Sequence, residues 1–201
     1  DLNGKPLIAY TINAALKSIH LDRVVVSSEN SKILKISNSF GADILKRPRN
    51  ISKDTSTTFD VIKHTISNIK GFNFVVVLQP TSPLRDEKHI DKAIKFLEEK
   101  KADAVISVCN VDHSPLWSNT LPNNKSMKGF LNNEVINKRS QDLQKYYRLN
   151  GAIYICKINK LLEEKSLFLK DNIYAFKMPQ EKSIDIDTKL EFIIAKHLLN
   201  K

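Results

Sequence analysis

The chain has 201 residues, a formal net charge of +10 at pH 7 and charged side chains at 27% of its positions. This length suits one domain with a single sizeable core, and the charge suits an acidic partner such as a phosphorylated small molecule, nucleic acid or an anionic membrane. The lysines are scattered through nearly every segment rather than gathered with aromatic residues in a basic patch, so we expect no nucleic-acid partner. No apolar stretch approaches the roughly 20 residues that span a bilayer, so we expect no membrane partner.

The two cysteines, Cys109 and Cys156, each lie inside an apolar, strand-like run. They show neither CxxC spacing nor a histidine at metal-ligand spacing. We therefore predict that both are reduced core thiols and that the protein works in a reducing, cytoplasmic setting.

Helices and strands are predicted to alternate at the start of the chain. Apolar residues recur at helical spacing from Pro6 and again after Asn30 or Ser31, which can cap a helix that ends at Gly41. The predicted elements are a helix over 6–18, a strand over 23–28, a helix over 31–40 and a strand over 43–46. Arg47 precedes a proline, which disfavours helical geometry and places Arg47 at the end of the second strand, where open α/β sheets bind ligands.

Residues 54–58, Asp-Thr-Ser-Thr-Thr, combine a carboxylate with hydroxyl side chains just before a predicted helix. One interpretation is a well-capped helix start. A helix N-terminus also offers free N–H groups to an anion or a polar ring, so the same hydroxyls are candidates for nucleotide binding.

The stretch Phe74–Arg85 is an unbroken apolar run that ends in a polar turn with two prolines. Such a run predicts a buried parallel strand, and the carboxyl end of that strand is a ligand-binding position. Because Pro80 and Pro83 fix the backbone, Gln79 and the hydroxyls after it would be held on a stiff loop. A helix is predicted to follow over 86–100.

A further apolar run over 104–111 completes a βαβαβ pattern. This pattern predicts the α/β class, as a three-layer sandwich with a mostly parallel, Rossmann-like sheet and right-handed crossovers. The alternation then stops at residues 112–147, which are rich in proline and asparagine. A compact domain rarely keeps so long an irregular segment without a use for it, so we predict a small hairpin or arm that packs on another subunit. A flexible surface excursion is the alternative.

Regular structure is predicted to resume as a strand over 151–156, a helix over 159–164, a strand over 173–178 and a helix over 188–199. Residues 183–187, Ser-Ile-Asp-Ile-Asp, would place Asp185 and Asp187 on the same face of an extended segment. Two carboxylates side by side favour a cation between them, and Mg²⁺ with phosphate oxygens completing its shell fits. The alternative is that Asp187 caps the last helix.

Taken together, five segments resemble the acylneuraminate cytidylyltransferases, also called CMP-sialic acid synthetases, over nearly the whole chain. They are Asn-Gly-Lys-Pro-Leu-Ile-Ala-Tyr-Thr-Ile at 3–12, Lys-Arg-Pro at 46–48, Leu-Gln-Pro-Thr-Ser-Pro-Leu-Arg at 78–85, Asn-Gly-Ala-Ile-Tyr at 150–154 and Ser-Ile-Asp-Ile-Asp at 183–187. Any one of them alone would be weak, but the Gln-Pro-Thr-Ser-Pro block and the final Asp-Ile-Asp are specific in this order.

The resemblance implies a single cytidylyltransferase domain over residues 1–201, with 112–147 as an arm that forms a dimer contact. The anomeric hydroxyl of a nine-carbon 2-keto sugar acid would attack the α-phosphate of CTP, giving a CMP-sugar and pyrophosphate. Asp185 and Asp187 would be the catalytic pair and hold Mg²⁺. By similarity, the nucleotide would be bound by Arg47, Thr57 and Thr58, and the sugar by Gln79, Tyr154 and Arg139, with Arg139 acting in the site of the neighbouring subunit of a homodimer.

Two departures from the family pattern carry expectations of their own. The family begins with a strand and an Arg-Gly-Gly-Ser-Lys loop around the triphosphate, and the printed sequence has neither, so we expect the printed chain to be inactive and its sheet to have a central gap. Trp117 stands where some relatives carry lysine, which leaves N-acetylneuraminate, legionaminate and pseudaminate open as the sugar. The rival functions are a cytidylyltransferase for the eight-carbon acid Kdo or another sugar, and a non-catalytic nucleotide-binding relative.

Overall fold

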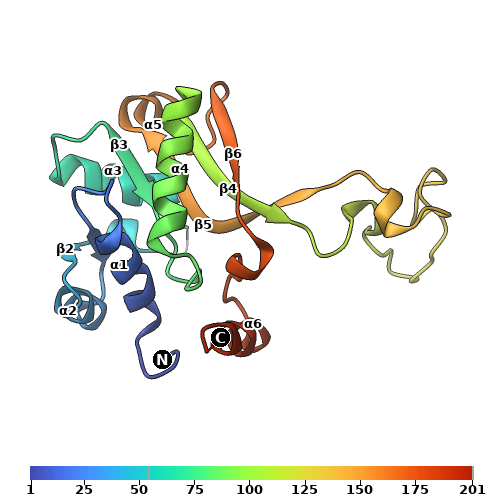
Figure 1. Cartoon of the computed structure of the whole chain (residues 1–201), viewed down its shortest axis with the longest axis horizontal. Coiled ribbons are helices and arrows are strands. Elements are labelled where there is room, and N and C mark those ends of the chain that lie inside the picture. The colour runs from blue at the N-terminus through green and yellow to red at the C-terminus, as the bar shows by residue number, and fades with distance from the viewer. Residues whose placement is uncertain (54, 201) are drawn as a thin grey trace.

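The computed structural model describes residues 1–53 and 55–200; Asp54, the carboxylate of the predicted hydroxyl cluster, lies outside the described residues, as does Lys201. Its main helices and strands follow the predicted order closely (Figure 1). They are α1 (Leu7–Lys17), β1 (Val25–Ser28), α2 (Ser31–Ser39), β2 (Asp43–Lys46), α3 (Thr58–Asn68), β3 (Phe74–Val77), α4 (Glu87–Lys100), β4 (Ala104–Asn110), β5 (Tyr147–Lys157), α5 (Ile158–Glu164), β6 (Ile173–Lys177) and α6 (Lys189–Leu198).

Side-chain caps explain where two of the early helices begin. At α2, the Oδ1 atom of Asn30 accepts hydrogen bonds from the N–H groups of Lys32, at 2.8 Å, and Ile33, at 3.3 Å. At α3, Thr57 and Asp60 cap each other, because the Thr57 hydroxyl accepts from the Asp60 N–H and the Asp60 carboxylate accepts from the Thr57 N–H. The interpretation of this region as a capped helix start is therefore confirmed.

The strands form two separate sheets. β1 and β2 pair in parallel, and the other four strands form a sheet in the order β3-β5-β4-β6, in which β4 and β6 are parallel. Among the described residues, β1 is paired only with β2 and β3 only with β5, so each keeps one edge without a strand partner. The α/β class is confirmed, and the described strands form two sheets rather than one.

Strand β5 runs antiparallel to both of its neighbours, β3 and β4, whereas the sequence pattern predicts mostly parallel strands. The chain leaves β4 at Asn110 and returns at Tyr147, which is its direct partner across the ladder. No helix crosses over between these two strands within this described segment. Without a helical crossover, an antiparallel return is the direct way to pair consecutive strands.

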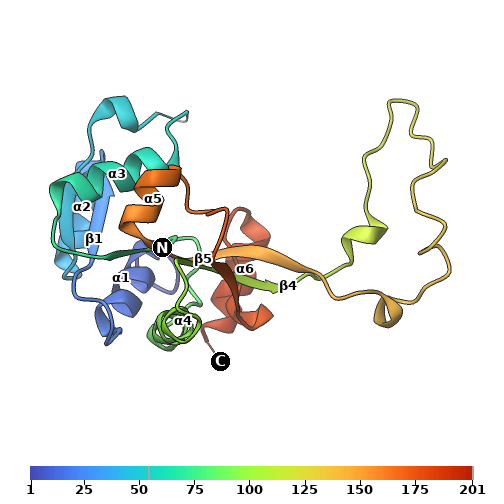
Figure 2. The same ribbon diagram turned by 90° about the horizontal axis from the view of Figure 1, so that it is seen from above.

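Helices cover both faces of the four-stranded sheet, which confirms the three-layer arrangement (Figures 1 and 2). Helices α1 and α4 cover one face, and α3 and α5 cover the other. The first core cluster includes Ala14, Ile90, Ala93, Leu97, Val105, Ile153 and Ile155, and the second includes Ile62, Ala104, Cys156, Leu161 and Leu169. Alternation along β4 explains the division, since Ala104 and Val105 point to opposite faces. Both cysteines are buried free thiols, as predicted.

The segment between β4 and β5 extends away from this body as an arm (Figures 1 and 2). It carries two short 3₁₀ turns, Pro115–Trp117 and Ser140–Asp142, and no strand pairing within residues 112–145, so the predicted small hairpin is not formed there. Large apolar side chains stand exposed on it, namely Leu121, Met127 and Ile136.

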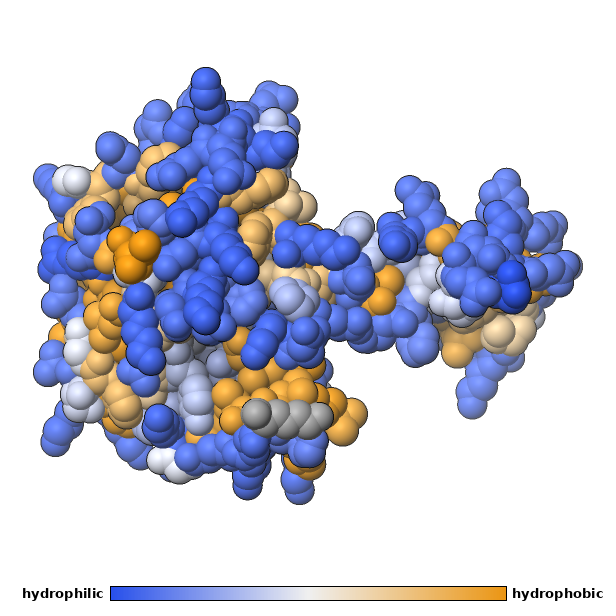
Figure 3. Space-filling view, in the orientation of Figure 1, coloured by the Kyte–Doolittle hydropathy of each residue, from blue (hydrophilic) through white to orange (hydrophobic). Residues whose placement is uncertain are grey.

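Helix α6 buries less of its apolar face than its pattern predicts. Leu190 is 66% exposed and Ile193 is 54% exposed, whereas Ala195 is fully buried. Apolar surface therefore lies at the lower edge of the body (Figure 3). No described helix is both long and apolar enough to cross a membrane.

Candidate active site

The loop after β3 is held in place by a buried arginine. The Nη2 atom of Arg85 donates to the Thr11 hydroxyl of α1 at 2.8 Å and approaches the Gln79 carbonyl at 3.4 Å. Arg85 is only 1% exposed, and burial lowers its pKa to about 10, so the guanidinium remains cationic at neutral pH. The loop that its two prolines are predicted to stiffen is thus also hydrogen-bonded to α1 through Arg85.

Beside this loop lies a cavity of about 280 Å³. It collects four of the predicted site residues, Thr57 and Thr58 from the start of α3, Gln79 from the loop after β3, and Tyr154 from β5. The other lining residues are Phe59, Val77, Lys165, Ser166, Leu167 and Phe168. The lining therefore combines apolar and aromatic side chains with hydroxyl, amide and ammonium groups.

Two of the lining residues, Tyr154 and Phe168, form an aromatic pair. The ring centroids of Tyr154 and Phe168 lie 6.3 Å apart with their planes at 75°. Burial, with the negative charge of Asp185 as a second cause, raises the pKa of Tyr154. The phenol therefore keeps its proton at neutral pH and can donate a hydrogen bond to a ligand.

The turn after α5 supplies residues that the sequence analysis missed. Lys165 ends the helix with a left-handed backbone (φ +54°) and, with Ser166 and Phe168, lines the cavity. Nothing in the local pattern of this turn indicates a site, because its residues reach the cavity only through the packing of α5 beside β5. A lysine here adds positive charge next to Gln79 and Tyr154.

Gly151 brings a predicted carboxylate against a predicted sugar-binding residue. A Cβ atom at this position would lie 2.3 Å from Gln79 Oε1 and 2.9 Å from Asp185 Oδ2. Both side chains therefore occupy space that only a glycine leaves free. The backbone of Gly151 is also left-handed (φ +71°), a conformation that favours glycine.

The two predicted carboxylates have different surroundings. Asp185 is half-buried, and its Oδ1 atom is buried without a hydrogen-bond partner in the described part of the chain. Asp187 is exposed, and Glu191 of α6 accepts from the N–H groups of Asp187 and Thr188. Thr188 is the residue at the start of α6, so the alternative that Asp187 caps this helix is wrong.

Asp185 fits a role as a Mg²⁺ ligand. Mg²⁺ prefers oxygen ligands and retains water or phosphate oxygens in its shell, and the free Oδ1 atom of Asp185 is an oxygen of that kind. Within residues 1–53 and 55–200, no group of three histidine, cysteine or acidic side chains forms a ready metal cluster.

Four predicted residues do not line this cavity, and besides Asp185 and Asp187 they are Arg47 and Arg139. Arg47 follows β2, as predicted, and its guanidinium contacts Glu29 at 2.5 Å and the Ser52 hydroxyl at 3.1 Å. Arg139 lies on the arm, exposed, and pairs with Asp142 at 3.0 Å. Neither lines the cavity.

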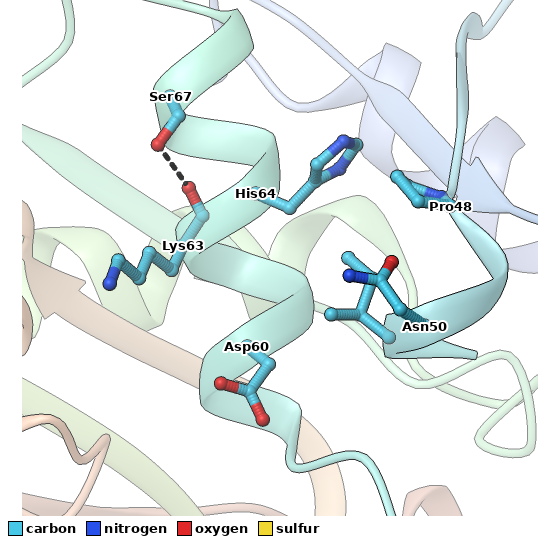
Figure 4. A pocket seen from close by; sticks show the side chains of 7 residues that line it. Pro48, Asn50, Asp60, Lys63, His64 and Ser67 are labelled. Atoms are coloured by element: carbon cyan, nitrogen blue, oxygen red, sulfur yellow. Dashed lines mark hydrogen bonds between the residues drawn. The ribbon is translucent and has the colours of Figure 1, made fainter. Parts of the chain in front are cut away.

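A second cavity, of about 310 Å³, lies on the other side of α3 (Figure 4). One face of α3 forms its wall through Asp60, Lys63, His64 and Ser67, opposite Pro48, Asn50 and Ile51 from the turn after β2. The His64 ring points across it toward Pro48 and Asn50 (Figure 4). Among the predicted site residues, none lines this second cavity.

Comparison with known proteins gives consistent relatives. A sequence profile described as Cytidylyltransferase matches residues 1–200. The N-acylneuraminate cytidylyltransferase of Escherichia coli is 34% identical over 195 residues, which cover 96% of this chain and 46% of that protein. The CMP-N,N'-diacetyllegionaminic acid synthase of Legionella pneumophila is 32% identical over 213 residues, which cover 98% of this chain and 87% of that protein.

The chain thus spans about half the length of the E. coli enzyme and of similar curated relatives. Among solved structures, a CMP:2-keto-3-deoxy-manno-octonic acid synthetase in complex with CTP superimposes with a TM-score of 0.70 at 14% identity, covering 100% of this chain and 91% of the other. At that identity the match concerns the fold, and it agrees with the Rossmann-like arrangement.

Proposed function

The chain belongs to the cytidylyltransferase family, and on that premise we propose that it is the part of an enzyme that transfers CMP from CTP to a nine-carbon 2-keto sugar acid. One observation carries the proposal. Gln79, Tyr154 and the two threonines line one cavity, and the Gln79 Oε1 and Asp185 Oδ2 atoms lie 2.3 and 2.9 Å from the position that a Cβ on Gly151 would take. That candidates for nucleotide binding and for sugar binding line one cavity although they are far apart in the sequence supports the proposal, as does the position of Asp185 near Gly151 and Gln79.

In the proposed reaction, the anomeric oxygen of the sugar forms a bond to the α-phosphorus of CTP. The bond from this phosphorus to the bridging oxygen breaks, pyrophosphate leaves, and the proton of the sugar hydroxyl passes to solvent water. Such a transfer depends on positioning and charge neutralisation more than on covalent catalysis. Mg²⁺ held by Asp185 and Asp187 would offset the charge that develops on the phosphate oxygens.

The residues of the cavity divide this task between the two substrates. Thr57 and Thr58, at the start of α3, would bind the nucleotide through their hydroxyl groups. Arg47 would bind it through its guanidinium from outside the cavity lining. Gln79 and the protonated Tyr154 offer hydrogen bonds to the sugar, while Phe168 gives an apolar surface to its acyl substituent. Lys165 is placed to attract the sugar carboxylate.

Pyrophosphate release tests the proposal. The complete gene product would be mixed with CTP and Mg²⁺, and with N-acetylneuraminate, legionaminate, pseudaminate and Kdo in parallel reactions. We expect release with one of the three nine-carbon acids. Release with Kdo alone would identify an eight-carbon substrate, and CTP binding without release in any reaction would identify a non-catalytic nucleotide-binding protein.

We further propose that the enzyme is a homodimer joined through the arm. The exposed Leu121, Met127 and Ile136 on the arm, and Leu190 and Ile193 on α6, support an apolar contact with a second copy. The two buried, free thiols support a reducing compartment such as the cytoplasm.

Mixed dimers test whether Arg139 acts across that contact. Subunits with Arg139→Ala and subunits with Asp185→Asn should each be inactive alone. A mixed dimer would contain one site with both residues intact if Arg139 serves the neighbouring subunit, so mixing should restore activity. If the mixture stays inactive although mixed dimers form, Arg139 does not act in the partner's site.

A further inference from the structure

A fully bonded polar network crosses the core behind the candidate site. Ser107, Asn150 and Ser183 are each at most 1% exposed. The Asn150 amide oxygen lies 2.6 Å from the Ser107 hydroxyl, and its amide nitrogen donates to the Ser183 hydroxyl at 2.9 Å. Ser183 in turn donates to the Pro179 carbonyl at 2.7 Å. Buried polar groups are costly unless they are satisfied in this way, so the network holds its three segments in one arrangement.

The network lies where the β4–β5 ladder is interrupted. Ile106 pairs with Tyr154, but Val108 pairs with Leu149, so extra residues of β5 bulge opposite Ser107. The Ser107 hydroxyl bridges the interruption, accepting from the Ile153 N–H at 2.8 Å. Bulges bend a strand and re-aim its side chains, and they are frequent next to active sites.

Asn150 and Gly151 are consecutive residues of this bulge, and they contact different parts of the protein. Asn150 points into the core and bonds Ser183, two residues before Asp185. Gly151 lies against the functional groups, with Gln79 Oε1 and Asp185 Oδ2 in the space that a side chain would need. One bulge therefore binds the Ser183 side chain through Asn150 and, at Gly151, leaves space for the Asp185 carboxylate.

That segment is anchored again on its other side. The Ile186 N–H donates to the carbonyl of Thr81, in the same loop as Gln79, at 2.8 Å. Asp185 is thus held between Ser183, fixed by Asn150, and Ile186, fixed by the Gln79 loop. Its Oδ1 atom is left buried without a partner among the described residues, as a ligand-binding oxygen would be.

We propose that Asn150 and Gly151 are paired positioning residues: Asn150 fixes the segment that carries Asp185, and Gly151 leaves the gap in which the Asp185 carboxylate and the Gln79 amide meet. This inference rests on the proposed function, because it assigns a consequence to the spacing of those two groups. Groups that orient a metal ligand typically change metal affinity by about 10- to 100-fold when they are removed.

Two conservative variants test the two roles separately. Ser183→Ala removes the hydroxyl that Asn150 binds, and it changes no residue that touches a substrate. We expect about tenfold weaker binding of Mn²⁺, used as a probe for Mg²⁺ and measured directly by electron paramagnetic resonance with CTP present. The sugar KM should stay within about twofold of the native value, because Gln79 is not displaced.

Gly151→Ala should have a broader effect. The new Cβ would displace both Gln79 and Asp185, so we expect about tenfold weaker Mn²⁺ binding together with an increase of about tenfold in the sugar KM. Gly41→Ala is the matched control, since Gly41 is also left-handed (φ +91°) but its Cβ would meet only Leu16, at 3.3 Å. It should lower the melting temperature without changing either binding constant.

The outcomes separate this inference from the proposed function. If Ser183→Ala and Gly151→Ala lower the melting temperature but leave the Mn²⁺ affinity and the sugar KM at native values, the positioning roles are overturned. If the native protein binds CTP and Mn²⁺ but releases no pyrophosphate with any sugar acid, the proposed function fails. The Mn²⁺ comparison between native protein and Ser183→Ala would still decide whether Asn150 positions Asp185.

Discussion

The two cavities on either side of α3 have similar volumes but very different origins. The cavity with Gln79 and Tyr154 is built from α3, the loop after β3, strand β5 and the turn after α5, which are far apart in the sequence. The cavity in Figure 4 is built from one face of α3 and the adjacent turn after β2. Its size is comparable, yet it gathers no group from the strand ends of the four-stranded sheet. Convergence of distant elements, rather than volume, distinguishes the candidate site from the second cavity.

The strongest test of this difference is Asp185→Asn. Removing the charge that would hold Mg²⁺ should lower kcat by about 10³-fold or more, because a metal contributes several kcal/mol of charge stabilisation. Asparagine keeps the shape of the side chain, so circular dichroism and the melting temperature should stay near native values. Native turnover at saturating Mg²⁺ in the variant would remove Asp185 from the metal site.

A pair of amide substitutions compares the two cavities directly. Gln79→Ala should raise the sugar KM about tenfold and the CTP KM much less, because it removes a hydrogen bond made only to the sugar. Asn50→Ala, an amide in the second cavity, should leave both constants within about twofold. Steady-state kinetics with each substrate varied in turn makes the measurement; equal increases in both KM values for Gln79→Ala would contradict its sugar role.

Tyr154→Phe should have a smaller effect, about three- to tenfold on the sugar KM, for the loss of one neutral hydrogen bond. Because the pKa of Tyr154 is raised above its ordinary value of 10.0, the phenol stays protonated as the pH rises from 7 to 9. The ratio of native to variant KM should therefore be flat over that range. A ratio that rises toward one between pH 7 and 9 would mean that the phenol ionises there.

The smallest effect is expected from His64→Ala in the second cavity. The side chain faces Pro48 and Asn50 in a cavity that none of the predicted site residues lines (Figure 4). Both KM values and kcat should stay within about twofold of native. A tenfold loss in any of them, at an unchanged melting temperature, would show that the second cavity takes part in the reaction.

Local patterns in the sequence were sufficient for most elements of the fold. Asn30 and Thr57 cap helices where expected, and the apolar run from Phe74 becomes β3 beside the predicted polar loop. The direction of β5 was not predicted, because strand direction depends on how the arm returns to Asn110 rather than on any residue of β5. The apolar face of α6 illustrates the same limit, since periodicity indicates a face but not whether another element covers it.

The candidate site was predictable where a short motif carries several groups at once. Gln79 and Tyr154 belong to such motifs, and they line one cavity. Phe168 and Lys165 were missed because the turn after α5 has no distinctive spacing and reaches the cavity only through packing. The role of Gly151 was also not visible in the sequence, because the gap it leaves depends on side chains from two other segments.

The arm leaves β4 at Asn110 and joins β5 at Tyr147, and these two residues pair directly. The arm is therefore an insertion whose two ends are held together by the β4–β5 ladder. The entropy of closing a flexible loop grows only logarithmically with its length, by about 0.6 kcal/mol for each doubling. Lengthening, trimming or exchanging the arm therefore costs the body little stability. Selection can reshape what the arm reaches while leaving the strand ends around Gln79 and Asp185 unchanged.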